Sequence, residues 1–204
     1  MPASRSEPGP HAGAGSGSGE TELADGPLLI RAGHGDVLAF RALVDRHLAS
    51  ILRIARRMLN EDAEAEDVAQ EAMLRLWRTA STLEVGASGV RPWLRRVVSN
   101  LCIDRIRAGQ RTEVTDAVPE QEVPPSQLQA LCEASLSAGV DAALNALPER
   151  QRLALTLFHY EGLSQVEVGE VIGVSEEAVE SLLARARRAL KLSLQEHWRQ
   201  LLSK

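Results

Sequence analysis

Four basic side chains near the end of one helical segment could readily contact a polyanion. They are Arg185, Arg187, Arg188 and Lys191. They lie off the apolar stripe that helical spacing gives this segment, so they can point outward while the stripe is buried. Basic groups in such clusters neutralise phosphates, which supplies most of the non-specific affinity of proteins for DNA. The pattern favours DNA contact, and the alternative is that these charges only complement the helix dipole.

The residues before this cluster predict a helix, a tight turn and a second helix. Ser164 and Glu167 have the spacing of a capping box at a helix start. Gly173 ends that helix, because glycine turns tightly at little steric cost. Ser175 is placed to cap the next helix, and Pro148 suits the start of an earlier one. This is the pattern of a helix-turn-helix, whose second helix enters the DNA major groove.

The composition favours an all-α protein. Hydrophobic residues make up 44% of the 204 residues and aromatic residues only 3%, with Leu, Val and Ala prevailing. No apolar run approaches the roughly 20 residues that span a bilayer, and the N-terminus lacks the apolar core of a signal peptide. Cys102 and Cys132 stand outside any CxxC pair. We expect a cytoplasmic protein with no metal, no cofactor and no membrane insertion.

Composition also divides the chain into four parts. Residues 1–25 are rich in Gly, Pro and Ser and are expected to be a disordered tail. Residues 26–108 and 137–204 are expected to be two small helical domains. Residues 109–136 between them are predicted to be a flexible acidic linker, since residues 112–136 hold five acids and no Lys or Arg.

Helical periodicity predicts which side chains of the two domains face inward. In the first helix of residues 26–108 they are Leu38, Leu43, Leu48, Leu52, Ala55 and Leu59. In the second they are Val68, Ala72, Leu76 and Trp77. In the third they are Trp93, Val97, Leu101, Ile103 and Ile106. In the last two helices of residues 137–204 they are Val168, Ile172, Val179, Leu183, Ala186 and Leu190.

Four segments in order resemble the extracytoplasmic-function (ECF) sigma factors of the sigma-70 type, the promoter-specificity subunits of bacterial RNA polymerase. GDVLAFRALVDRH resembles the opening helix of that family, and AEDVAQEAMLRLW resembles its polymerase-binding helix. RPWLRRVVSNLCIDRIR resembles the helix that opens the minus-ten element. The segment from LPERQRLAL to ARARRAL resembles the domain that reads the minus-thirty-five element. The resemblance covers about residues 26–108 and 137–192.

The resemblance implies three sets of site residues. The core-binding residues, expected to contact core polymerase, are Asp67, Gln70 and Glu71. The minus-ten residues are Arg95, Arg96, Asn100, Asp104, Arg105 and Arg107, and loop 81–90 would receive a flipped-out base. The minus-thirty-five residues are Ser175, Glu177, Glu180, Ser181, Arg185, Arg187 and Arg188. The family commonly has basic residues where Glu180 and Leu182 stand here, which weakens a residue-by-residue transfer of DNA contacts.

The implied partners are core RNA polymerase, promoter DNA and an anti-sigma factor, with no small-molecule substrate. The family also implies a stress or envelope-response regulon. Three other classes remain alternatives. A dimeric helix-turn-helix regulator would bind DNA without polymerase, and a partner-sequestering protein would not need Asn100 or the basic helix. An enzyme is disfavoured, because the scattered histidines show no metal spacing and no catalytic triad is visible.

Overall fold

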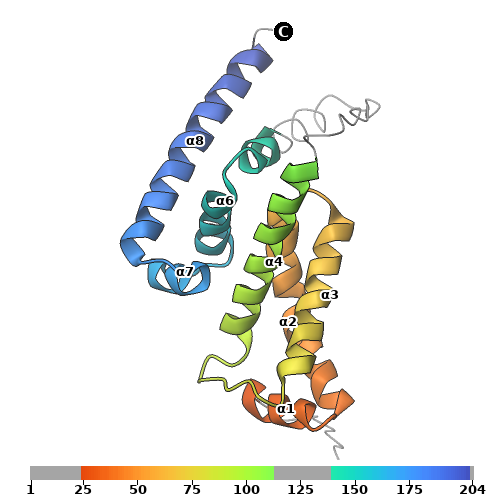
Figure 1. Ribbon diagram of the computed structural model, residues 1–204. Coiled ribbons are helices and arrows are strands. Elements are labelled where there is room, and N and C mark those ends of the chain that lie inside the picture. The colour runs from red at the N-terminus through yellow and green to blue at the C-terminus, as the bar shows by residue number, and fades with distance from the viewer. Residues whose placement is uncertain (1–23, 113–138, 203–204) are drawn as a thin grey trace, which may run out of the picture.

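The computed structural model describes residues 24–112 and 139–202. The first of these two parts holds four helices (Figure 1). They are α1 (Asp25–Gly33), α2 (Val37–Met58), α3 (Asp62–Thr79) and α4 (Arg91–Thr112). The second part begins with a short helix over residues 139–145. It continues with α6 (Glu149–Leu155), the π-helix η1 (Thr156–Tyr160), α7 (Gln165–Ile172) and α8 (Glu176–Leu202). Neither described part contains a strand, so the all-α prediction is confirmed.

Two predicted segments lie largely outside the described residues, namely the tail at 1–25 and the linker at 109–136. At the boundary of the second, α4 continues to Thr112, so its last turn enters the segment predicted to be linker. The described helix therefore extends past Gly109.

Local sequence signals set the ends of the helices as expected. The Ser164 hydroxyl accepts from Glu167 N at 3.3 Å, and the Glu167 carboxylate accepts from Ser164 N at 2.8 Å, which completes the capping box. Gly173 has a φ of 75°, the left-handed conformation that ends α7. Gly169 is required for a different reason, because a Cβ there would lie 2.7 Å from the Val174 carbonyl oxygen. The turn between α7 and α8 is thus fixed by its own residues.

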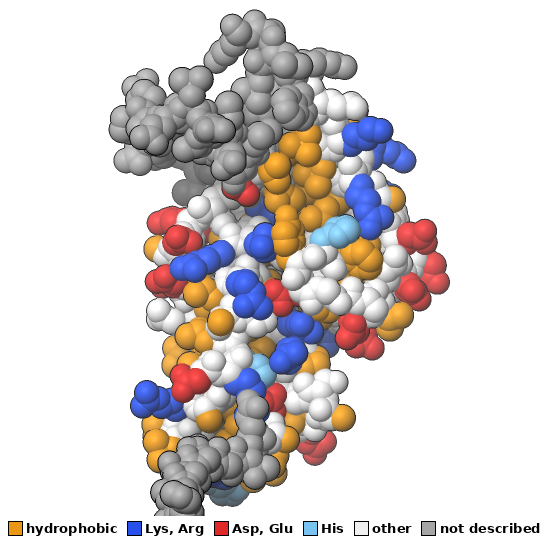
Figure 2. Space-filling view, turned by 180° about the vertical axis from the view of Figure 1, so that it is seen from behind, with side chains coloured by type: hydrophobic (Ala, Val, Ile, Leu, Met, Phe, Trp, Pro, Cys, Tyr) orange, Lys and Arg blue, Asp and Glu red, His pale blue; other side chains and the backbone are white. Residues whose placement is uncertain are grey.

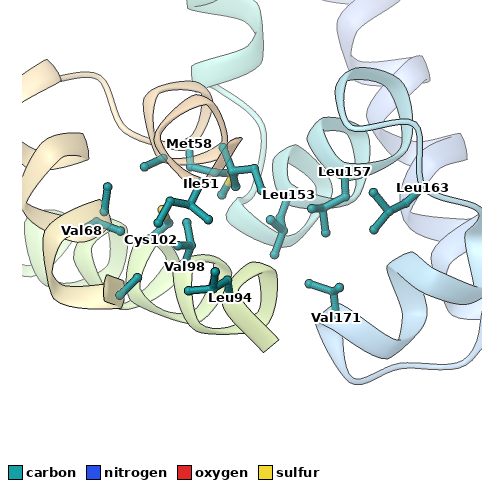
Figure 3. Close-up of a cluster of buried hydrophobic side chains, with 14 of the residues drawn as sticks. Ile51, Met58, Val68, Leu94, Val98, Cys102, Leu153, Leu157, Leu163 and Val171 are labelled. Atoms are coloured by element: carbon teal, nitrogen blue, oxygen red, sulfur yellow. The ribbon is translucent and has the colours of Figure 1, made fainter. Parts of the chain in front are cut away.

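The hydrophobic core is continuous through both parts of the chain. Buried side chains from α2, α3 and α4 meet buried side chains from α6, η1 and α7 in a single cluster (Figure 3). From the first part, the figure labels Ile51, Met58, Val68, Leu94, Val98 and Cys102. From the second, it labels Leu153, Leu157, Leu163 and Val171. The two predicted domains are therefore packed against each other in this structure, with α4 between the other first-part helices and α6 and α7.

The inward faces predicted for α3, α7 and α8 agree with the observed burial. Fully buried members are Val68, Ala72, Leu76, Val168, Val179, Leu183 and Ala186, and half-buried members are Trp77, Ile172 and Leu190. In α2, the predicted Leu43, Ala55 and Leu59 are buried, whereas Leu48 and Leu52 are half-buried. The prediction for Leu38 is wrong: it is 73% exposed. It lies in the first turn of α2, where the neighbouring Ala39 is the buried side chain instead.

The inward face predicted for α4 packs against the core but is offset from the most deeply buried face. The most deeply buried side chains are Leu94, Val98 and Cys102, one position along from the predicted Trp93, Val97 and Leu101. Those three and Ile106 are half-buried, and of the predicted set only Ile103 is buried. The reason is that α4 contacts helices of both parts and so buries a broader surface than a single amphipathic stripe.

Candidate nucleic-acid interface

The minus-thirty-five residues comprise Ser175, just before α8, and six residues of the first four turns of α8. Six of them are exposed and Ser181 is half-buried. Glu177, Ser181 and Arg188 recur at spacings of four and seven, which places them on one face of the helix. That face is acidic in the first turns and basic further along. Two neighbouring acids in the first turn complement the positive end of the helix dipole.

Three members of this set have local partners. The Ser175 hydroxyl hydrogen-bonds Glu177 and thereby lowers the pKa of its carboxyl, so Glu177 stays ionised. Arg187 lies against η1, with Nη2 3.5 Å from His159 Nε2 and its guanidinium carbon 5.8 Å from the centre of the Phe158 ring. Arg187 is therefore held beside the π-helix.

The minus-ten residues are not brought together on one surface. Arg96, Asn100, Asp104 and Arg107 are exposed and follow one another at spacings of four and three along α4. Arg105 lies on another side of the helix, where its Nη1 is 4.0 Å from carboxylate oxygens of Glu64 and Asp67 in α3. Arg95 lies against the second part of the chain.

Arg95 is covered by an acid that sequence reasoning did not select. Its side chain is 14% exposed, and its Nη2 lies 3.8 Å from Glu161 Oε2. The Arg95 Nε is buried without a hydrogen-bond partner among the described residues. Burial lowers the pKa of Arg95, and the facing carboxylate of Glu161 opposes that shift. The Arg95 guanidinium, which was expected to contact DNA, is thus paired with Glu161 within the protein.

Glu161 follows η1 and joins three groups of the first part. Its side chain is only 5% exposed. Besides facing Arg95, it accepts a hydrogen bond from Ser50 Oγ at 3.1 Å and lies 3.7 Å from Arg53 Nε. No motif marks Glu161 in the sequence, because its partners are distant along the chain.

Further polar contacts join the two parts around this point. The Arg152 side chain, which is buried, donates to Met58 O at 2.9 Å and to Asn145 O. Arg107 donates to Glu149 Oε1 at 2.9 Å, a hydrogen bond that lowers the pKa of Glu149. Figure 2, which views the molecule from the side of α2, shows Lys and Arg side chains gathered along the middle of this face. Arginines thus carry most of the polar contacts between the two parts.

Loop 81–90 joins α3 to α4 and is held at its end by α1. Asp25 Oδ2 accepts from Val90 N at 3.0 Å and lies 3.0 Å from His47 Nε2, while Oδ1 accepts from Arg46 Nη1 at 2.7 Å.

A cavity of about 330 Å³ is lined by Asp25, Arg46 and His47 together with loop residues 87–89. A second cavity, of about 400 Å³, lies between loop residue Ser88, the start of α4 and α7.

The core-binding residues lie on the outer side of α3. Asp67 and Gln70 are exposed, and Glu71 is half-buried. Arg75 Nε donates to Glu71 Oε1 at 2.8 Å, which lowers the pKa of Glu71. Leu74 is 48% exposed and lies one turn beyond Gln70, so it extends this surface with an apolar contact. Sequence reasoning passed over Leu74 because it falls off the buried stripe.

The described residues contain no candidate metal cluster and no candidate membrane span. They contain no group of three His, Cys, Asp or Glu side chains that could hold a metal. Burial raises the pKa of Cys102 to about 12, so its thiol is not ionised at neutral pH. Among the helices of these residues, none is long and apolar enough to span a bilayer. Cys132 lies outside them.

Comparison with known proteins matches both parts of the chain. Residues 43–112 match the family model described as "Sigma-70 region 2", and residues 137–190 match "Sigma-70, region 4". The chain is 32% identical over 169 residues to the ECF RNA polymerase sigma factor SigL of Mycobacterium tuberculosis, covering 81% of this chain and 94% of SigL. It is 35% identical over 173 residues to SigM of that species, covering 84% and 85% of the two chains.

Two solved structures share this fold. CnrH, in complex with the cytosolic domain of CnrY, has a TM-score of 0.61 and 27% identity, covering 85% of this chain and 99% of that chain. The sigma factor RpoE, in complex with the anti-sigma factor NepR from Bartonella quintana, has a TM-score of 0.60. Its identity is 22%, with coverage of 78% and 98%, so this likeness supports the fold alone.

Proposed function

This chain belongs to the extracytoplasmic-function RNA polymerase sigma factors, and we propose that it directs core RNA polymerase to promoters through two separate DNA contacts. The observation that carries this function is the match of region 2 and region 4 to residues 43–112 and 137–190, in that order. Each region presents an exposed polar helix face, on α4 and on α8. We assign the protein no reaction of its own, because RNA synthesis is carried out by the polymerase.

The two helices would divide the recognition of DNA. On α4, the exposed amide of Asn100 offers a donor and an acceptor to an extruded base, so its contacts depend on base identity. On α8, Arg185 and Arg188 carry charge suited to phosphates, which position a protein without reading sequence. Glu180 would accept from cytosine N4 if it enters the groove.

The packing of the two regions against each other would block part of this DNA recognition. The Glu161 carboxylate forms an ion pair with Arg95, which belongs to the minus-ten set. In addition, α6 and α7 cover one side of α4. We therefore propose that the two regions separate before promoter DNA is bound. A protein inhibitor that stabilises the packed form would hold the sigma factor inactive. The similar protein CnrH forms a complex with the cytosolic domain of another protein, CnrY, which supports this proposal. We place the action in the cytoplasm and in a stress or envelope response.

Run-off transcription from a promoter library with purified core polymerase tests the proposed function. We expect start sites that depend on this protein, and footprints that appear only when core polymerase is added. A footprint of equal extent by the isolated protein at physiological salt would instead favour a stand-alone regulator. Absence of any promoter-specific product with core polymerase would contradict the sigma-factor function.

Replacing Asn100 with alanine is expected to relax preference at one minus-ten position, with a cost of about 1–3 kcal/mol there. Replacing Arg188 with alanine is expected to weaken all promoters alike and to lower the salt slope of binding by about one unit. A randomised-promoter transcription assay measures both. The assignment is wrong if Asn100→Ala weakens every sequence equally and Arg188→Ala changes the preferred base.

Replacing Glu161 with glutamine keeps its shape and removes the charge that faces Arg95 and Arg53. We expect the two regions to separate more readily and duplex DNA to bind more tightly, with a salt slope steeper by about one unit for the released arginine. Fluorescence anisotropy over a salt series measures this effect. Glu170→Gln is the matched control, because it removes one charge from an exposed residue of α7. Equal binding by both variants would contradict the masking of Arg95.

A further inference from the structure

Helix α1 contacts loop 81–90 at both of its ends. At the end of α1, a Cβ on Gly33 would lie 2.7 Å from Ser81 Cα and 2.9 Å from Ala80 O, so the two backbones touch directly. At its start, Asp25 binds Val90 N. Gly89, at a φ of +65°, packs so closely on Asp25 that a Cβ would lie 2.7 Å from the carboxyl carbon. One nine-residue helix therefore brackets the loop.

The Asp25 carboxylate is the polar centre of this contact. It is 8% exposed and meets three donors, from Arg46, His47 and the Val90 backbone. Burial would raise the pKa of Asp25, but hydrogen bonds from His47, Arg46 and Val90 outweigh it and lower the pKa, so the group is a charged acceptor. A buried carboxylate with three donors holds them in a fixed geometry, because any lost partner leaves a desolvated charge.

We propose that Asp25 is a positioning residue for minus-ten recognition: by fixing Gly89 and Val90 it sets the shape of the loop surface that receives the flipped-out base. The proposal rests on the proposed function. It is supported by the cavity of about 330 Å³ that Asp25, Arg46 and His47 share with loop residues 87–89, since a shift of the loop reshapes that cavity. Asp25 and Gly33 lie outside the residues that match region 2, which begin at 43. The contact is thus added to the matched region by the chain before it.

Two variants break this contact from opposite sides. Asp25→Ala removes the acceptor, and Gly89→Ala pushes the loop away from Asp25 because the new Cβ cannot fit. Asp36→Asn is the matched control: Asp36 is an aspartate outside this contact, which accepts from Leu38 N and Ala39 N at the start of α2. Amide hydrogen exchange in the full chain is expected to show faster exchange at Val90 in the two test variants and unchanged exchange there in the control.

The functional readout is transcription by the holoenzyme from a promoter library randomised at the minus-ten element. We expect Asp25→Ala and Gly89→Ala to reduce the preference at the flipped position by about tenfold, with affinity for core polymerase and minus-thirty-five preference unchanged. The double variant is expected to add nothing further, because both changes break one contact. Asp36→Asn keeps a side-chain oxygen for the cap but loses the ion pair with Arg31 at 2.7 Å, so it is expected to lower thermal stability slightly while keeping the base preference.

Three outcomes would overturn the proposal. The first is unchanged Val90 exchange in both test variants. The second is lost Val90 protection with an unaltered base preference. The third is an equal loss of preference in Asp36→Asn, which would make the effect one of general stability. A wild-type holoenzyme without promoter-specific transcription would overturn the sigma-factor function and this proposal together, whereas a specific wild type with any of the three outcomes overturns the role of Asp25 alone.

Discussion

Replacing Leu153 with alanine is expected to lower the free energy of unfolding by about 2–5 kcal/mol, the range for truncating a fully buried leucine. Leu153 lies in α6 and is buried in the cluster that also contains Ile51 and Val98 of the first part (Figure 3). Because that cluster is continuous, we expect the loss to be felt by both parts. Denaturant unfolding followed by amide exchange in α2 and α6 measures it.

An exposed leucine provides the control for this experiment. Leu192 in α8 is largely exposed, so Leu192→Ala is expected to change stability by no more than about 0.5 kcal/mol. If Leu153→Ala lowers protection in α6 but leaves α2 at its wild-type protection, the two parts unfold independently. The shared core would then contribute little to cooperativity.

Replacing Asp67, Gln70 and Glu71 together with alanine is expected to reduce affinity for core polymerase by about 100-fold or more, as removal of an interface hot spot does. The three side chains lie on the outer side of α3, away from the buried Val68 and Ala72. Their removal is therefore expected to leave the helical content unchanged. A pull-down with core polymerase, paired with circular dichroism, measures both quantities.

Glu66→Ala is the matched control for the triple variant. Glu66 is an exposed acid of the same helix, and its carboxylate is paired with Arg56 at 3.4 Å. We expect it to keep wild-type affinity for core polymerase. Unchanged affinity in the triple variant would place the polymerase contact elsewhere, and an equal loss in Glu66→Ala would indicate a general charge effect.

Features fixed by neighbouring residues could be predicted from the sequence. Ser164 and Glu167 form a capping box with each other, and Gly173 ends the same helix through its own backbone conformation. The helix-turn-helix could therefore be located from the spacing of these residues alone. The buried stripe of α3 follows the helical repeat for the same reason, because it packs on one side.

Features that depend on residues far apart in the chain could not be predicted. Glu161 matters because it meets Ser50 and Arg95, and neither spacing nor composition links these positions. The inward face of α4 was misplaced because a helix packed on two sides has no single apolar stripe. Asp25 was counted in the tail, yet it binds Val90, 65 positions further along the chain.

The contact of Arg152 with the end of α2 has a consequence for exchanging modules between sigma factors. In this chain region 4 supplies the donor that satisfies Met58 O, and it supplies the carboxylate that covers Arg95. Consider a chimera that joins this region 2 to the region 4 of another sigma factor. It would keep the exposed face of α4, but it would lose Arg152 and Glu161 unless the other region 4 has equivalent residues. Such a hybrid would leave a carbonyl and a guanidinium without partners where the modules meet. Whether two modules can be combined therefore depends on these contacts between region 2 and region 4 as well as on promoter recognition.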